Sequence, residues 1–154
     1  MKMTSLPYWK ELPTIDLYLD QVLLYVNELM AIAYETSLQK PLTASMINNY
    51  VKHGYVQKPF KKKYGKHQIG QLVVISLLKE VFSIQELTAM LQNLSKDYDA
   101  EYLYDAFIHC FDKTCHPEER PCPQVISLAC QTVTLYHQTT AQMLLLEGQH
   151  HESK

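Results

Sequence analysis

Apolar residues recur at helical spacing through most of the chain, with prolines between the runs. After Pro13 they follow i, i+4, i+7 spacing, which predicts a first helix over about residues 14–34. Residues 69–82 are apolar nearly all round, so this stretch predicts a helix buried at the centre of the fold. Ser83 followed by Glu86 is a capping-box pattern, and it predicts a short helix that runs through about residue 93.

The second half of the chain continues the helical pattern. Ser95 is followed by three acidic residues at alternate positions, which predicts a helix start there and a helix to about residue 113. Prolines mark a loop over about residues 116–123, and apolar spacing predicts a long final helix over residues 124–147. The predicted fold class is therefore all-α, with one small hairpin near residues 55–64.

Residues 43–53 form the most informative predicted helix, because polar and apolar side chains separate cleanly on a helical wheel. The polar side carries Ser45, Asn48, Asn49 and Lys52, and the apolar side carries Met46, Ile47, Tyr50 and Val51. Thr43 can cap the start, and Gly54 can end the helix in a left-handed conformation. Asn can bond bidentately to adenine in a DNA major groove, and Lys can reach guanine or phosphate. An ordinary amphipathic surface helix would show the same pattern.

Composition excludes several classes of protein. The chain has 154 residues, of which 47% are hydrophobic, which is enough for a substantial core. Its four glycines form no glycine-rich loop of the kind that binds nucleotide phosphates, and we expect no cofactor. No apolar run approaches the roughly 18 residues that span a bilayer. The N-terminus has no apolar signal segment, so we expect a cytoplasmic protein with reduced cysteines.

Charge is segregated along the chain. Residues 36–79 hold eight lysines and no acidic residue, whereas residues 80–119 hold nine acids and two lysines. Five of the lysines crowd a stretch where proline and glycine disfavour a helix: Lys58, Lys61, Lys62, Lys63 and Lys66. One interpretation is a solvated lysine loop. The other is a phosphate-binding surface, because clustered ammonium groups release counterions from nucleic acid.

The predicted helix and the lysine stretch together resemble a known family. The recognition-helix signature of MerR-type winged helix–turn–helix regulators is an RYY triplet, then a glycine, two apolar residues and a proline, and residues 47–56 with Pro59 are similar to it. Lys62-Lys63-Tyr64 and the pattern from Ile69 to Leu87 resemble that family's wing and its two following helices. The resemblance covers about residues 42–91. The whole chain also resembles a family of small bacterial proteins catalogued only as a domain of unknown function.

The resemblance implies a domain organisation and a function. It implies a winged helix–turn–helix DNA-binding domain over residues 14–93 and a C-terminal helical region over residues 94–148. The implied function is that of a sequence-specific transcriptional regulator that binds double-stranded DNA. The assigned roles are base contacts from Ser45, Asn48 and Asn49, and phosphate contacts from Lys52, Lys58, Lys61, Lys62, Lys63 and Lys66. Tyr50 and Tyr64 either pack the domain or place a hydroxyl on a phosphate.

Two departures from the family pattern affect these roles. The Arg and the first Tyr of the triplet are replaced by Asn48 and Asn49, so an operator preference does not carry over. The wing arginine is replaced by Lys62, whose ammonium is a point charge where a guanidinium is a planar fork. Wing contacts are therefore expected to favour phosphates over bases.

The C-terminal region suggests two further hypotheses. MerR-type regulators dimerise through a helix beyond the DNA-binding domain, so residues 124–147 are the candidate for a homodimer contact, with packing onto their own domain as the alternative. A metal site is the second hypothesis, since the region contains His109, Cys110, Cys115, His116 and Cys122. Because no CxxC motif occurs and the spacing is poor, we expect core and loop thiols and no metal site.

A rival class is a helical protein-interaction module without nucleic-acid binding. In that case the acidic segment 80–119 would bind a partner or fold back on the lysines, which would leave no positive surface for DNA. An enzyme is not expected, because no spacing brings a nucleophile, a base and an orienting group together.

Overall fold

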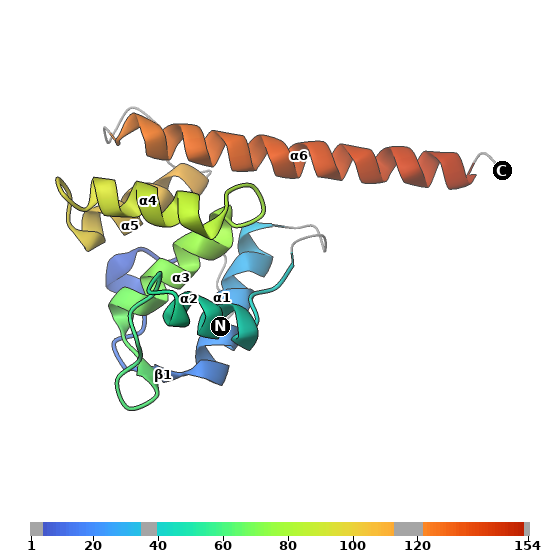
Figure 1. Cartoon of the computed structure of the whole chain (residues 1–154). Coiled ribbons are helices and arrows are strands. Elements are labelled where there is room, and N and C mark those ends of the chain that lie inside the picture. Colours follow the sequence, from blue (N-terminus) through green and yellow to red (C-terminus); the bar gives the residue numbers. More distant parts are fainter. Residues whose placement is uncertain (1–4, 35–39, 113–121, 153–154) are drawn as a thin grey trace.

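Helices make up most of the protein, in agreement with the apolar pattern. The computed structural model describes residues 5–34, 40–112 and 122–152 (Figure 1). Its elements are, in order, η1 (Trp9–Glu11), β1 (Leu17–Tyr18), α1 (Leu19–Ala33), α2 (Ala44–Lys52), β2 (Lys63–Tyr64), α3 (Lys66–Leu78), α4 (Ile84–Leu94), α5 (Ala100–Phe111) and α6 (Gln124–Glu152). None of the described helices combines the length and the hydropathy needed to cross a bilayer.

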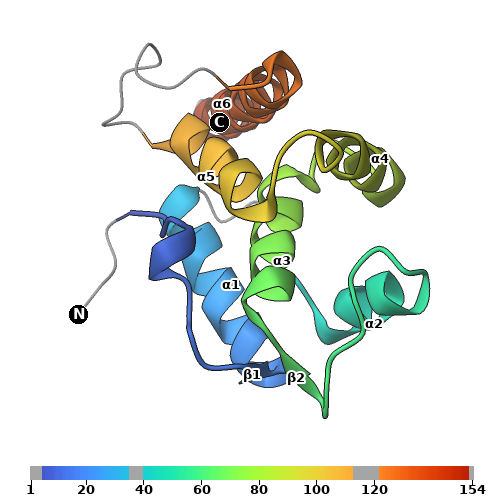
Figure 2. The ribbon, with the colours of Figure 1, turned by 90° about the vertical axis from the view of Figure 1, so that its left-hand side faces the viewer.

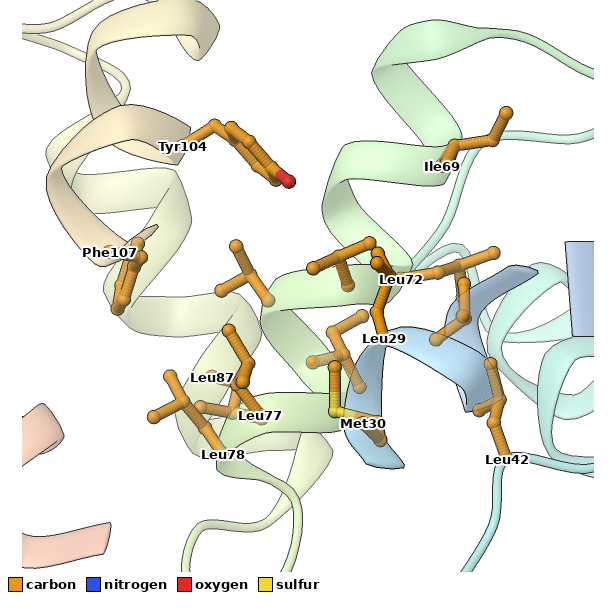
Figure 3. Close-up of a cluster of buried hydrophobic side chains, with 14 of the residues drawn as sticks. Leu29, Met30, Leu42, Ile69, Leu72, Leu77, Leu78, Leu87, Tyr104 and Phe107 are labelled. Carbon is orange, nitrogen blue, oxygen red and sulfur yellow. The ribbon is translucent and has the colours of Figure 1, made fainter. Parts of the chain in front are cut away.

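Helix α3 lies at the centre of the fold, as the apolar stretch 69–82 predicts. Ile69, Leu72 and Leu77 are completely removed from solvent, and α1, α4, α5 and α6 all pack against the helix. Figure 3 shows leucines of α1 and α3 together with Phe107 of α5 in this cluster. The hydrophobic core is continuous from the N-terminal segment to α6, so it includes residues of both predicted regions.

A short strand precedes the first helix, so the prediction of a helix from residue 14 is wrong at its start. Ile15 is 76% exposed, which means that its apolar spacing does not reflect packing. The helix begins instead at Leu19. The backbone just before it is committed to a sheet, in which β1 pairs antiparallel with β2, with Leu17 opposite Tyr64 and Tyr18 opposite Lys63.

The starts of α4 and α5 show one correct and one wrong prediction. The Ser83 hydroxyl accepts the Glu86 backbone N–H at 3.1 Å, and the Glu86 carboxylate accepts the Ser83 N–H at 3.0 Å, which confirms the capping box. The predicted helix start at Ser95 is wrong, because the Ser95 N–H bonds back into α4 and ends that helix. Asp99 is the residue whose side chain caps the first turn of α5.

Helix α6 runs well past the body of the protein (Figure 1). Its first turns pack on α5 and α3, where Ile126, Cys130 and Val133 are buried. From residue 142 to residue 150 every side chain is exposed. The predicted final helix over residues 124–147 is confirmed and continues to Glu152. Most of the predicted loop over residues 116–123 lies outside the described residues.

Candidate nucleic-acid interface

Helix α2 occupies the predicted range, and both of its ends are capped. The Thr43 hydroxyl accepts the Met46 N–H at 3.2 Å. At the other end Gly54 has a φ of 76°, and the Tyr55 N–H donates to the Tyr50 carbonyl at 2.8 Å. A left-handed glycine with such a returning bond is a common way to end a helix. Local sequence therefore determines both ends of α2.

The polar and apolar faces of α2 separate as the helical wheel predicts. Ile47 is fully buried and Tyr50 is 8% exposed. Burial also raises the pKa of the Tyr50 phenol, in keeping with a packing residue. The predicted DNA-contacting residues of the helix are all exposed: Ser45, Asn48, Asn49 and Lys52. The helix thus presents a hydroxyl, two amides and an ammonium to solvent.

The side-chain amide of Asn27 on α1 fixes the entry to α2. Its Nδ2 donates to the Leu42 carbonyl at 3.0 Å, and its Oδ1 accepts the Leu42 N–H at 2.9 Å. Because one amide bonds both backbone groups of a buried residue, α2 is held in register against α1. Sequence reasoning missed Asn27, since a polar residue inside an amphipathic helix gives no sign of its partner.

The wing turn, which we define as residues Phe60–Lys63, is a two-residue turn closed by an isolated bridge between Phe60 and Lys63. The predicted hairpin near residues 55–64 is reduced to this turn, because β2 pairs with β1. Phe60 donates its N–H to the Lys63 carbonyl at 3.1 Å, and Lys63 donates to the Phe60 carbonyl at 2.9 Å. The central residues Lys61 and Lys62 have φ values of 51° and 66°. Positive φ at both positions is typical of a type I′ turn, which favours Asn and Gly. Such a conformation costs an L side chain about 1–2 kcal/mol.

Gln68 of α3 anchors the chain on both sides of the wing turn. Its Oε1 accepts the Gly65 N–H at 2.7 Å. Its Nε2 donates to the carbonyls of Gln57 at 2.8 Å and Lys58 at 3.1 Å. The side chain is buried, so these three bonds form away from water and hold the turn against the core. Sequence reasoning missed this residue as well, because it lies at the start of an apolar helix.

The predicted phosphate-contacting lysines of the wing differ in exposure. The Lys63 ammonium lies 5.2 Å from the centroid of the Tyr18 ring, and the Lys66 ammonium lies 5.5 Å from that of the Trp9 ring. A cation over an aromatic face keeps its charge while its position is restricted. The exposed lysines are Lys58, Lys61 and Lys62, and the half-buried lysines are Lys63 and Lys66.

These lysines are not neutralised by acidic residues of the described chain. The one ion pair in the part that the structure describes joins Lys79 and Glu80 at 2.9 Å, at the end of α3. The acidic residues between positions 80 and 112 therefore form no ion pair with the wing. A fold-back of the acidic segment onto the lysines is not observed among the described residues.

The wing turn lies at the end of the molecule away from α6. Figures 1 and 2 view the chain from directions at right angles, and in both α6 is on one side and the wing turn on the other. Residues 53–59 connect the end of α2 to the wing turn. The C-terminal helix does not cover the exposed face of α2.

Two aromatic residues lie at the wing turn and beside it. Tyr64, predicted either to pack the domain or to place its hydroxyl on a phosphate among the DNA contacts, is 3% exposed, and burial raises its pKa. It holds β2 in the core and does not reach the surface. Phe60, which sequence reasoning did not single out, is 75% exposed at the wing turn, with the Lys61 ammonium 5.5 Å from its ring centroid. The available signal was an apolar residue between a proline and a lysine run.

The candidate metal ligands of the second half do not converge in the described part of the chain. There, no three side chains of His, Cys, Asp or Glu are placed to hold a metal ion. Cys110, Cys122 and Cys130 are free thiols. Cys115 and His116 lie outside the described residues.

Comparisons with known proteins identify the family. No curated protein and no solved structure matches the chain significantly. A protein family matches residues 7–107, which is more than half of the chain. The matched region contains α2, the wing turn and the helices that pack on them, and it stops before α6. The chain belongs to DUF1836, a family described as a domain of unknown function.

Proposed function

We propose that the chain is a sequence-specific transcriptional regulator that binds double-stranded DNA in the manner of a winged helix–turn–helix protein. In this proposal α1 and α2 are the helix–turn–helix pair, α2 enters the major groove, and the wing turn lies on the backbone. The supporting observation is an exposed amide-bearing helix face followed by lysines that no described acid neutralises. Helix α2 has nine residues. It is therefore about 13 Å long, comparable to the roughly 12 Å width of the groove.

The proposed contacts divide into base recognition and charge neutralisation. Ser45, Asn48 and Asn49 face the base edges, where an amide can bond bidentately to adenine. Lys52 and the wing lysines face phosphates, which position the protein without reading sequence. Asn27 and the Gln68 anchor keep the two surfaces in a fixed relation, because each bonds backbone at the base of its element.

A salt titration tests this proposal. Fluorescence anisotropy of labelled random and genomic duplexes gives the slope of log K against log salt concentration. If each proposed lysine neutralises one phosphate, that slope is about −5 for each bound copy. The proposed lysines are Lys52, Lys58, Lys61, Lys62, Lys63 and Lys66. Binding without salt dependence, or no binding at low ionic strength, would contradict the proposal and favour a helical protein-interaction module.

Two substitutions separate the two kinds of contact. Lys62→Ala should weaken binding to every duplex and reduce the magnitude of the slope by about one. Asn49→Ala should relax the sequence preference and cost about 1–3 kcal/mol on the preferred duplex. Lys96→Ala is the matched control, because Lys96 is an exposed lysine between α4 and α5, outside the proposed surface. Binding should not change in this control.

We also propose that two copies pair through α6. Its C-terminal half presents exposed apolar side chains that no described part of the chain covers: Met143, Leu144, Leu145 and Leu146. A dimer formed there would leave α2 free in each copy and let the pair read half-sites about one helical turn apart. Light scattering should therefore show a dimer, and Leu145→Glu with Leu146→Glu should give a monomer. Gln142→Glu is the control, and a monomeric parent protein would contradict the proposal.

A further inference from the structure

Three free thiols meet where the end of α5 packs against the start of α6. Cys110 lies in the last turn of α5, Cys122 in the non-helical residues just before α6, and Cys130 in α6 itself. All three line one cavity of about 470 Å³, together with residues that include the titratable His109 and Asp112 and the polar Ser127 and Gln131. Cys110 and Cys122 are half-buried, whereas Cys130 is 3% exposed. The cavity thus brings two solvent-accessible thiols to a buried one.

Hydrogen bonds give the three sulfurs different chemistry. Hydrogen-bonding interactions with Cys130 and Cys122 act on the ionisation of Cys110. The bond from Cys130 is the main cause that lowers the pKa of Cys110 to about 7, against the opposing effect of burial. The same bond, together with burial, raises the pKa of Cys130. The pKa of Cys110 is lowered and that of Cys130 is raised, so Cys110 is the more readily ionised of these two thiols.

We propose that Cys110 is a peroxide-reactive thiolate and that Cys122 resolves its oxidised form into a disulfide that joins α5 to the start of α6. The inference stands on the cavity and its thiols, and it is independent of the proposed DNA binding. Cys122 suits the resolving role because it lies outside a helix and lines the same cavity as Cys110. The pKa values of Cys122 and Cys130 are both raised, but Cys130 is only 3% exposed inside α6, which makes it the less accessible attacking thiol. It is a positioning residue that stabilises the Cys110 thiolate.

The reaction balances with a hydroperoxide as the oxidant. The Cys110 thiolate attacks a peroxide oxygen, so an S–O bond forms and the O–O bond breaks. The leaving hydroxide, or alkoxide, takes a proton from water, and Cys110 becomes a sulfenic acid. The Cys122 sulfur then attacks the Cys110 sulfur, which forms the S–S bond and breaks the S–O bond. The released hydroxide takes the proton of the Cys122 thiol, so two thiols lose two electrons and the peroxide is reduced.

The test uses the full chain with Cys115→Ser, which leaves the three cluster thiols as its only cysteines. The protein is treated with equimolar hydrogen peroxide at pH 7, blocked with iodoacetamide, and mapped by mass spectrometry without reduction. We expect the loss of two thiols per chain and a Cys110–Cys122 linked peptide. A Cys110–Cys130 link, or a reaction no faster than that of free cysteine, would overturn the proposal.

Single variants on the same background assign the roles. Cys122→Ser should stop at a sulfenic acid on Cys110 that dimedone traps, and Cys110→Ser should leave the other thiols unoxidised. Cys130→Ala should slow the reaction at pH 7 by roughly tenfold and move the midpoint of Cys110 alkylation to higher pH, because the donor to the thiolate is lost. Circular dichroism confirms that each variant is folded. An unchanged pH profile in Cys130→Ala, or normal oxidation in Cys110→Ser, would contradict these assignments.

Discussion

The wing turn predicts a double substitution that stabilises the fold while it weakens DNA binding. Lys61 and Lys62 have φ values of 51° and 66°, and an L side chain there costs about 1–2 kcal/mol. Lys61→Asn with Lys62→Gly introduces the pair that a type I′ turn favours. At the lower bound of about 1 kcal/mol for each position, the double substitution removes about 2 kcal/mol of backbone strain. Glycine offsets about 0.5–1 kcal/mol of this gain, because it raises the conformational entropy of the unfolded chain. The free energy of unfolding should rise by about 1 kcal/mol.

Two assays measure the two halves of this prediction. Thermal unfolding should show a Tm higher by about 2–4 °C, the shift expected of 1 kcal/mol in a chain of this size. The salt titration should lose about 1.8 from its slope if both lysines contact phosphates. Lys61→Ala with Lys62→Ala is the matched control, because alanine removes both charges and keeps the left-handed strain. This control should lose the same slope and gain no stability.

Each half can be refuted separately. If the Asn-Gly variant is no more stable than the Ala-Ala variant, the left-handed backbone is not strained in this turn. If the slope is unchanged in both variants, the wing turn does not touch phosphates. A general loss of structure cannot imitate the expected pattern, because stability and binding are expected to move in opposite directions.

Other contacts give further expectations. Phe60→Ala removes an exposed apolar side chain from the proposed DNA-binding surface but removes no charge. Duplex binding should therefore weaken while the salt slope stays unchanged, and a changed slope would contradict an apolar role for Phe60. Asn27→Ala leaves both Leu42 backbone groups unpaired and should lower the free energy of unfolding by about 1–3 kcal/mol in urea, and a neutral result would refute the anchor. Burial lowers the pKa of His137 from its ordinary 6.5, so charging it opposes folding and stability falls as pH drops below 6.5. His137→Phe should lose less stability between pH 7 and pH 5, and an equal loss would refute this.

Helical spacing together with local end signals was sufficient to predict α2 and α4, whereas α3 was predicted as a helix but ends at Leu78 and not at residue 82. Thr43 and Gly54 bound α2, and Ser83 begins α4. The same reasoning failed at β1, since a strand of two residues is too short to show alternation. Its partner β2 follows α1 and α2 in the chain, so nothing local to β1 indicates that a sheet forms.

The candidate surface was predictable where exposure follows from a helical face, and not where it depends on tertiary packing. The exposed positions of α2 follow from its wheel, but the burial of Tyr64 and the exposure of Phe60 depend on how β2 meets β1. Cys110, Cys122 and Cys130 match no motif by spacing. Only the packing of α5 on α6 brings them into one cavity, which is why the sequence suggested unrelated core and loop thiols.

Helix α6 shows most clearly what a periodic pattern leaves open. Its 29 residues extend about 44 Å, whereas a compact domain of this length is roughly 40 Å across. The helix therefore outruns the core on which its first turns pack, and Met143 and Leu144 are 55% and 41% exposed. An apolar stripe indicates a buried face but does not say which chain buries it. Polar residues would serve a monomer equally well at positions 143–146, and the proposed pairing with a second copy would bury those apolar side chains that lie on the shared face of α6.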